Sequence, residues 1–468
     1  EHQVALFPLS SGKNWGFGSK MPAKDGAVIV DLMALNRIIK IDHELGYAVI
    51  EPGVTQRQLS EALAESKSPY FLDVTGSSPD TSIIGNSLER GIGYNELRVK
   101  TLGCLEVVLG SGNVVKTGFG HFEIDSDVTH LYPYGIGPNL DALFFQSNFG
   151  IVLSGTIQLL RRPRSIAHLT LFIKDEKKVP DVILKLSKLK EKNLISGIPH
   201  VFSRERADPG MAGMLYYELK QRGQDTSETN ISSYLDSKFS GEWTVSACMM
   251  GSPLQVFLAG WVCWLQLFRF GMVLIMTDGW HKYLSWFSGL FGFRKWNILL
   301  SVFKRIRHVP IGKPLDEFVA SVHWPVTKEL DSVDLLEPDE GDAGFVYSAP
   351  FAAATPEAVE KMLDLTNQVA KQHGFTAAVT LNLVTTKLVE GVISISYSRS
   401  APEIVKKAKQ CIRDMNIRFN KEGMFPYRAD IDSMDIFVND QDVFWKTCAA
   451  IGKVLDPKGI IAPGRYSL

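Results

Sequence analysis

Small polar residues and glycines gather near the start of the chain, at positions 10–19 with the sequence SSGKNWGFGS. The tract follows a short apolar run and precedes a second one at residues 27–32. A loop with little side-chain bulk exposes its backbone N–H groups, so it can close around a pyrophosphate. The same residue types also form ordinary turns between strands, and the tract alone leaves that alternative open.

Further short motifs follow the tract in a fixed order along the chain. They are residues 51–55 (EPGVT), 83–86 (IIGN), 88–94 (LERGIGY), 105–109 (LEVVL), 134–138 (YGIGP), 148–152 (NFGIV) and 455–466 (LDPKGIIAPGRY). This ordered set resembles the flavoproteins of the vanillyl-alcohol oxidase and p-cresol methylhydroxylase group. The resemblance runs from the first residues to the last and is weaker in the middle of the chain.

The resemblance implies that the chain binds FAD. The residues that it assigns to the cofactor are Ser10, Ser11, Gly12, Lys13, Asn14, Gly18, Ser19, Gly53, Gly85, Asn86, Gly150, Ile151, Val152 and Arg465. It implies an α+β fold, in which a p-cresol methylhydroxylase-type FAD-binding domain of two subdomains is joined to an α+β cap domain with an antiparallel sheet. In that group a strand and a helix precede the pyrophosphate loop, so we expect the numbered sequence to lack an N-terminal piece.

The pattern of apolar residues divides the chain in the same way. Residues 1–162 form the expected FAD-binding domain, residues 163–439 the cap that holds the substrate, and residues 440–468 a segment that returns to the first domain. Helical spacing predicts amphipathic helices at 56–66, 179–194, 355–372 and 403–419. Short apolar runs on either side of Gly110–Asn113 predict a hairpin.

The resemblance also implies a site for a phenolic substrate. Tyr427 and Arg428 match a Tyr-Arg pair that grips a phenolate, since Arg supplies a permanent charge and Tyr an O–H donor. The loop position that usually carries a second phenolate-binding Tyr is Phe17 here. Glu390 and Gly391 stand where some members carry the His that bonds to the flavin, so we expect FAD to be held without a covalent bond.

Bulk composition excludes several other classes. The chain has 468 residues and a net charge of -1, which does not favour a nucleic-acid partner. Its five cysteines are scattered without a C-x-x-C pair, so we expect neither a disulfide framework nor a metal site. The start of the chain carries no signal pattern, and we expect a cytoplasmic protein, with membrane association as an alternative.

The segment from Pro253 to Val309 is unusually apolar and aromatic, with basic residues toward its end. Three interpretations are open. It is a buried or subunit-interface helix, as in a homodimer, or a membrane-surface anchor, or a true span interrupted by Arg269.

We therefore predict an FAD-dependent oxidase or dehydrogenase. It removes a hydride from a benzylic or allylic carbon or alcohol of a small aromatic, phenolic or apolar substrate, and oxygen or an electron carrier reoxidises the flavin. Two alternatives remain: a membrane-associated flavin dehydrogenase of a lipid or isoprenoid alcohol, and a degenerate flavoprotein subunit without activity.

Overall fold

The computed structural model describes residues 4–236 and 241–467, and the chain forms two compact units. The first unit comprises Glu1–Thr75, Pro79–Arg162 and Arg428–Leu468, and the second comprises Gly76–Ser78 and Pro163–Tyr427. The chain re-enters the first unit at Arg428, whereas the sequence analysis places this return at residue 440. Residues 1–3, at the start of the expected first domain, lie outside the described residues.

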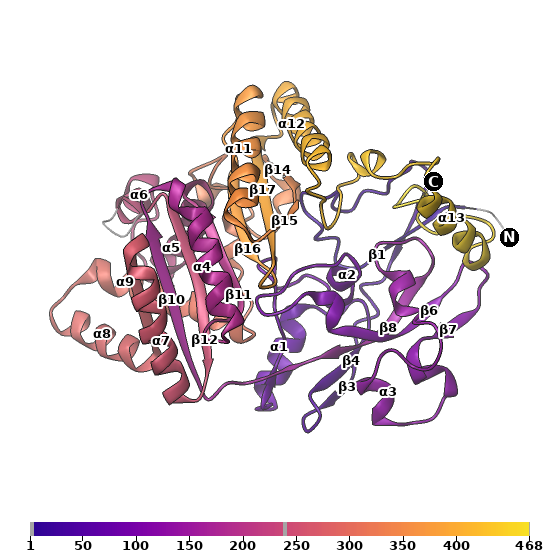
Figure 1. The fold of residues 1–468 in the computed structure, drawn as a ribbon, viewed down its shortest axis with the longest axis horizontal. Helices are drawn as coiled ribbons and strands as arrows, with labels where there is room; N and C mark the ends of the chain where they lie inside the picture. The colour runs from indigo at the N-terminus through magenta and orange to yellow at the C-terminus, as the bar shows by residue number, and fades with distance from the viewer. Residues whose placement is uncertain (1–3, 237–240, 468) are drawn as a thin grey trace. The chain divides into compact units, whose positions relative to one another are not determined.

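An antiparallel sheet in the order β3-β4-β8-β6-β7 forms the centre of the first unit (Figure 1). Its strands are β3 (Ile38–Asp42), β4 (Tyr47–Ile50), β6 (Leu102–Val108), β7 (Val114–Lys116) and β8 (Ile151–Gln158). The predicted hairpin is confirmed, because β6 pairs with β7. Two short strands of the same unit, β5 (Tyr70–Phe71) and β9 (Leu160–Arg161), form a separate antiparallel pair.

The glycine-rich tract lies between two strands that pair in parallel, β1 (Leu6–Leu9) and β2 (Val28–Asp31). The helices of this unit are α1 (Gln56–Glu65), α2 (Ile83–Leu88), α3 (Asp127–Leu131) and α13 (Val443–Leu455). Helix α1 begins where Thr55 accepts a hydrogen bond from the Gln58 backbone N–H, and it buries Leu59 and Leu63 one turn apart. The helix predicted at 56–66 is thus confirmed.

The second unit is built on an antiparallel sheet in the order β13-β10-β12-β11-β16-β17-β14, with β15 also paired to β17. Its strands are β10 (Ser165–Ile173), β11 (Ser196–Ser203), β12 (Trp243–Gly251), β13 (Met272–Thr277), β14 (Ala343–Ser348), β15 (Phe351–Ala353), β16 (Ala378–Leu383) and β17 (Leu388–Ser398). Strand β10 is buried at every residue after the first, so both faces of the sheet are covered there.

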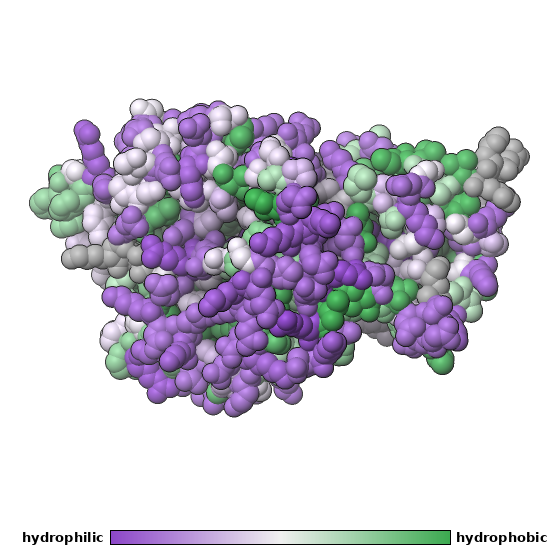
Figure 2. Space-filling view, turned by 90° about the horizontal axis from the view of Figure 1, so that it is seen from above, coloured by the Kyte–Doolittle hydropathy of each residue, from purple (hydrophilic) through white to green (hydrophobic). Residues whose placement is uncertain are grey.

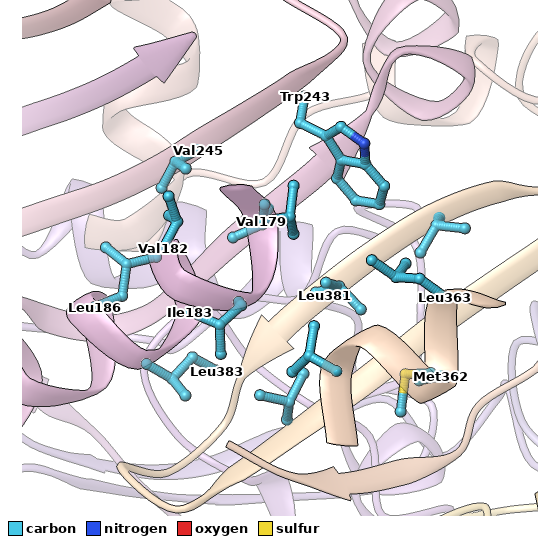
Figure 3. Packing of buried hydrophobic residues seen from close by; sticks show 14 of the residues in the cluster. Val179, Val182, Ile183, Leu186, Trp243, Val245, Met362, Leu363, Leu381 and Leu383 are labelled. Carbon is cyan, nitrogen blue, oxygen red and sulfur yellow. The ribbon is translucent and has the colours of Figure 1, made fainter. Parts of the chain in front are cut away.

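The second unit also contains the helices that connect and cover these strands. They are α4 (Val179–Glu191), α5 (Arg204–Gln221), α6 (Glu228–Leu235), α7 (Pro253–Leu267), α8 (Asp278–Leu290), α9 (Arg294–His308), α10 (Glu317–Ala320), α11 (Pro356–Gln372) and α12 (Pro402–Lys421). The three helices predicted in this region correspond to α4, α11 and α12 and are confirmed. Figure 3 shows side chains of α4, α11, β12 and β16 pointing toward one another in the core. The mixture of helices and antiparallel sheets confirms the α+β class.

The apolar segment that the sequence analysis treats as one stretch forms several elements. It folds as α7, the edge strand β13, α8 and α9. Gly271 separates α7 from β13, and a Cβ there would lie against the Phe172 carbonyl oxygen. Among the described residues, no helix combines the length and apolarity needed to cross a membrane.

Candidate functional site

The glycine-rich tract folds as a tight loop. Gly12, Gly16 and Gly18 have φ angles of 66°, 77° and 114°, which side chains with a Cβ rarely adopt. The Asn14 carbonyl oxygen accepts hydrogen bonds from the backbone N–H groups of Phe17 at 3.1 Å and Ser19 at 3.0 Å. The chain thus curls around one carbonyl group.

The loop lies against the beginning of α2. The Ser82 backbone N–H donates to Ser11 Oγ at 2.9 Å, and the Ser82 hydroxyl donates to the Pro52 carbonyl oxygen at 2.6 Å. A Cβ on Gly85 would lie 2.7 Å from Ser10 Oγ, so the close approach depends on glycine. Three motifs that are far apart in the sequence, at 10–19, 51–55 and 82–86, therefore meet in one unit.

Arg428 comes to this loop from the other end of the chain. Its guanidinium carbon lies 3.7 Å from the centroid of the Phe17 ring, and its Nη1 donates to Asn14 Oδ1 at 3.2 Å. Both partners belong to the loop, and Phe17 is buried. A Cβ on Gly18 would also meet Ile431 Cγ2 at 2.7 Å, so residues 428–431 pack directly on the loop. A cation–π contact of this kind fixes the plane of the guanidinium.

The C-terminal residues complete the same region. Ala462 N–H donates to the Leu6 carbonyl oxygen and Leu6 N–H to that of Ile460, each at 2.7 Å, so this segment pairs with β1. Arg465 forms an ion pair with Glu89, immediately after α2. Burial disfavours the charged form of Arg465, but the charge of Glu89 acts in the opposite direction, and the pKa of Arg465 is raised.

Tyr466 holds the residue that follows Arg428. The Tyr466 hydroxyl donates to the Ala429 carbonyl oxygen at 3.1 Å and accepts from the Ala429 N–H at 2.9 Å. Burial, together with the nearby Glu89 charge, raises the pKa of Tyr466, so the phenol remains a hydrogen-bond donor. Arg428 is therefore held through its neighbour as well as through its own side chain.

The remaining predicted cofactor residues pack around this arrangement. Ile151 contacts the small cluster of Phe7, Ile461 and Ala462, while Val152 is paired with Val107 in the sheet. A Cβ on Gly150 would lie 2.5 Å from Val107 Cγ1, and one on Gly53 would lie 2.5 Å from the Met33 carbonyl oxygen. These two glycines allow close backbone packing.

Lys13 belongs to the loop, and Asn86 lies in α2. Lys13 Nζ lies 5.1 Å from the centroid of the Trp15 ring. In the described part of the chain, Asn86 Oδ1, Trp15 Nε1 and Thr81 Oγ1 are buried and have no hydrogen-bond partner. Buried polar atoms of this kind normally find partners. A bound dinucleotide would supply such partners, and the glycine-lined loop has the backbone form to hold its diphosphate, so the residues fit FAD.

A buried pair of charged side chains shapes the neighbouring loop. The Asp73 carboxylate accepts hydrogen bonds from Asn95 N at 3.0 Å, Asn95 Nδ2 at 2.9 Å and Glu96 N at 2.9 Å. Burial raises the pKa of Asp73 and lowers that of Arg98 to about 10, while their charges act on each other in the opposite direction. The Glu96 side chain is 46% exposed and lies 3.2 Å from Lys100 Nζ, as expected of a solvated loop residue.

The second unit carries Tyr427. It also contains a row of polar side chains whose grouping the sequence analysis does not predict. Tyr427 N–H donates to the Ala349 carbonyl oxygen at 3.2 Å, and its ring centroid lies 5.8 Å from that of Phe351. In the sheet, His200 is paired with Asn382 and Asn382 with Glu390. Asn382 Nδ2 donates to Glu390 Oε2 at 2.7 Å, and both side chains are buried.

The row faces away from the main core of its unit. Leu381, Leu383 and Val389 belong to the core cluster, and side chains alternate between the two faces of a strand. Asn382 and Glu390 consequently lie on the opposite face. A buried carboxylate with an amide donor can accept a proton or orient a hydroxyl group. The alternation of apolar and polar residues in β16 and β17 was the signal that could have revealed this row.

Comparison with known proteins gives three findings. A model described as an FAD binding domain matches residues 1–118. The 1'-carboxy-chondrochloren decarboxylase of Chondromyces crocatus is 31% identical over 484 residues, covering 100% of this chain and 86% of that protein. The 4-cresol dehydrogenase [hydroxylating] flavoprotein subunit of Pseudomonas putida is 26% identical, covering 100% of this chain and 84% of its own length.

A solved structure agrees with these relatives. The crystal structure of p-cresol methylhydroxylase with substrate bound superposes with a TM-score of 0.81 and 26% identity, over 100% of this chain and 85% of that one. The fold and the loop thus define a flavoprotein, an FAD-dependent oxidoreductase. The chain belongs to the FAD-linked oxidoreductase family whose members share the p-cresol methylhydroxylase-type FAD-binding domain, which confirms the resemblance found in its motifs.

The close approach of Ser10 to α2 gives a direct test of the cofactor loop. We expect Gly85→Ala to weaken FAD binding about tenfold, because the added Cβ displaces the Ser10 hydroxyl and the loop with it. The dissociation constant is measured by adding FAD to the apoprotein and following flavin fluorescence.

The matched control is Gly210→Ala in α5, where a Cβ would meet nothing within 4 Å. This variant should bind FAD as the wild type does. Unchanged FAD binding by Gly85→Ala, with a folded protein, would show that the contact between Ser10 and α2 does not shape the cofactor site.

Proposed function

We propose that this enzyme removes a hydride from the benzylic or allylic carbon of a phenolic substrate, with FAD held non-covalently. The observation that carries the proposal is the position of Arg428, whose guanidinium is held on Phe17 and Asn14 of the glycine-rich loop. The name of one relative, a 4-cresol dehydrogenase [hydroxylating] flavoprotein subunit, supports a 4-alkylphenol as the substrate class. Bound FAD supplies the acceptor for the hydride.

Arg428 contributes charge to this reaction. A phenolate oxygen pushes electron density through the ring toward the para carbon, from which the hydride leaves with its electron pair. A permanent cation with directional N–H donors stabilises the phenolate form of the substrate. Tyr427, the preceding residue, adds an O–H donor. We assign to these two side chains the role of binding the phenolate oxygen.

Phe17 changes how this grip is built. It offers no hydroxyl to the substrate, but its ring provides the surface on which Arg428 lies. The orientation of Arg428 is thus set by stacking on Phe17 and by the hydrogen bond to Asn14. The site lacks the hydroxyl of a tyrosine at position 17, but its cation is rigidly held.

Oxidative decarboxylation is a second candidate. It is favoured by the relative from Chondromyces crocatus, which is named as a decarboxylase and is 31% identical over the whole of this chain. The chemistry is an extension of the first proposal. Once the hydride has left the benzylic carbon, a carboxylate on the neighbouring carbon can leave as CO₂, and the electron pair of the broken C–C bond forms a C=C bond. The electron-deficient benzylic carbon accepts that pair.

One experiment tests the proposed substrate class and separates the two candidates. We expect a 4-alkylphenol to bleach the visible flavin absorbance without oxygen. Its methyl ether, the 4-alkylanisole, forms no phenolate and should not bleach the flavin. With 3-(4-hydroxyphenyl)propanoate, CO₂ release indicates decarboxylation, and a product that retains its carboxylate indicates simple hydride removal. A protein that is bleached only by long-chain alcohols would contradict the phenol proposal.

The assignment of Arg428 is tested by substitution. We expect Arg428→Ala to lower kcat/KM for a phenol by about 100-fold or more, the usual effect of losing one donor to a developing oxyanion. The kcat/KM of Arg428→Lys should lie between those of the wild type and Arg428→Ala, because lysine keeps the positive charge but cannot stack as a planar group. Activity is followed by substrate-dependent flavin reduction.

The control is Arg161→Ala in the same unit. Arg161 also lies over an aromatic ring, that of Tyr70 at 6.0 Å, but it is exposed and away from the loop. Its removal should leave kcat/KM unchanged. If Arg428→Ala keeps activity within a few-fold of the wild type, Arg428 does not bind the phenolate.

The non-covalent state of FAD has its own measurement. Since Glu390 and Gly391 occupy the expected linkage positions, acid precipitation should leave all the FAD in the supernatant. A gel of the denatured protein should show no fluorescent band. A yellow pellet with a fluorescent band would reveal a covalent bond at another residue.

A further inference from the structure

Helix α7 exposes an apolar surface that its own unit leaves uncovered. It buries a stripe of small and medium residues, among them Val256, Ala259 and Cys263, against β10, β12 and β13. The following side chains, on the other side of α7 and directly after it, are each more than one-third exposed: Leu254, Phe257, Leu258, Trp261, Val262, Trp264, Leu265 and Phe268. A soluble surface helix normally has polar residues there.

Helix α8 and the turn that follows it continue this pattern. In α8, His281 and Ser288 are buried, whereas the following large side chains of α8 and the turn are exposed: Trp280, Tyr283, Trp286, Phe287, Leu290, Phe291 and Phe293. We call the exposed side chains of α7, α8 and this turn the apolar patch. Figure 1 places α7 and α8 at the end of the sheet formed by β10 and its neighbours, and Figure 2 shows a small group of hydrophobic residues at the tip of that end.

The aromatic side chains of the patch contact one another along each helix. On α7 the Trp264 ring lies 6.3 Å from Trp261 and 5.3 Å from Phe268, centroid to centroid. On α8 the Phe287 ring lies 6.4 Å from Tyr283 and 4.6 Å from Phe291. The rings thus form two ordered rows at the surface. Most of the apolar area of these rings stays exposed in the folded chain, so it is available to contact a binding partner.

The segment that carries the patch is mainly basic. Between Ser252 and Leu315 the sequence contains eight Lys or Arg residues and a single carboxylate, Asp278. Asp278 is itself in an ion pair with Arg307. Four basic side chains of this segment are exposed next to the apolar residues in the sequence: Arg269, Lys282, Arg294 and Lys295.

Helix α4 extends the basic rim at the end of α7. Lys185 Nζ donates to Gln266 Oε1 at 2.9 Å, which ties α4 to α7. The pKa of Lys185 is lowered, first by burial and then by the charges of Arg269, Lys188 and Lys192, so these cations lie near one another. The occupant of the patch must therefore be both apolar and anionic at its edge.

We propose that the apolar patch binds the surface of an anionic lipid bilayer, with α7 and α8 lying in the interface. Tryptophan and tyrosine side chains next to Lys and Arg favour the headgroup region of a bilayer. There the rings reach the boundary of the acyl chains, and the cations contact the lipid phosphates. A second copy of the chain is disfavoured, because a two-fold interface would bring this basic segment against itself. The enzyme is thereby held on a membrane without crossing it.

Vesicle binding tests the proposal on the full-length flavoprotein. We expect sedimentation with vesicles of phosphatidylcholine containing about 30% phosphatidylglycerol, and at least about tenfold weaker binding to phosphatidylcholine alone. Salt near 0.5 M should weaken the binding by a similar factor. At this concentration the Debye length is only about 4 Å, so the attraction between the basic side chains and the lipid phosphates is largely screened. Tryptophan emission should shift to shorter wavelength on binding.

Two pairs of variants locate the contact. We expect Trp261→Ser with Trp264→Ser, and separately Lys282→Glu with Arg294→Glu, to weaken vesicle binding about tenfold or more. The matched controls are Phe444→Ser on α13 and the pair Lys371→Glu and Lys406→Glu on α11 and α12, all exposed. The controls should bind as the wild type does. Each variant is checked for its melting temperature and flavin absorbance.

Three results would overturn the proposal. The wild type would fail to sediment with anionic vesicles at low salt, or the patch variants would bind as well as the controls. Alternatively, analytical ultracentrifugation would reveal a dimer that the tryptophan substitutions dissociate, which would assign the patch to a second copy. Loss of vesicle binding in the patch variants, with normal turnover of a soluble substrate, supports the bilayer.

Discussion

The first unit depends on the joining of the two ends of the chain. Strand β1 precedes the glycine-rich loop, and its pairing with Ile460–Ala462 fixes where that loop starts. The Arg465–Glu89 ion pair ties the same C-terminal segment to the end of α2, and both side chains are less than one-fifth exposed. Removing one partner from a largely buried ion pair costs about 3–5 kcal/mol. The loop conformation is therefore a property of the closed unit and not of the loop sequence alone.

This closure also explains how Arg428 comes to lie on the loop. Tyr466 belongs to the closing segment, and its hydroxyl holds both polar backbone groups of Ala429. The Phe17 ring then fixes the plane of the Arg428 guanidinium, and Asn14 accepts one of its hydrogen bonds. An arginine held in this way loses less side-chain entropy when an anion binds, because its rotamer is already selected. The Phe at position 17 therefore contributes a positioning surface even though it contributes no donor.

The sequence predicts the local parts of this structure well. Helices with a clear apolar stripe, such as α1, α11 and α12, follow from spacing because the stripe must face a core. The ordered motifs also lead to the FAD-dependent class. The sequence does not predict the contact of Phe17 with Arg428 or of Glu89 with Arg465. These pairs join residues hundreds of positions apart, and no local pattern encodes such a contact.

The apolar segment illustrates a second limit. Its composition from Pro253 to Val309 permits an interface helix, a membrane-surface anchor or a membrane span. Mean hydropathy over a segment does not reveal where the chain changes direction. In the structure it is divided by β13, whose pairing with β10 requires an extended backbone in the middle of the apolar run. The β-branched residues Val273, Ile275 and Thr277 favour this extended backbone, so strand propensity and long-range pairing act together here.

The buried histidines of the second unit limit the source of charge for an anionic substrate. Burial lowers the pKa of His168 and His200 to about 4, so both rings are neutral at physiological pH. Neutral imidazoles donate and accept hydrogen bonds but offer no countercharge. Asn382, beside His200 in the sheet, is neutral as well, and its partner Glu390 carries a carboxyl group. The polar row of the second unit can therefore orient hydroxyl groups or accept a proton. A phenolate needs a cation, and the proposed function accordingly assigns that charge to Arg428.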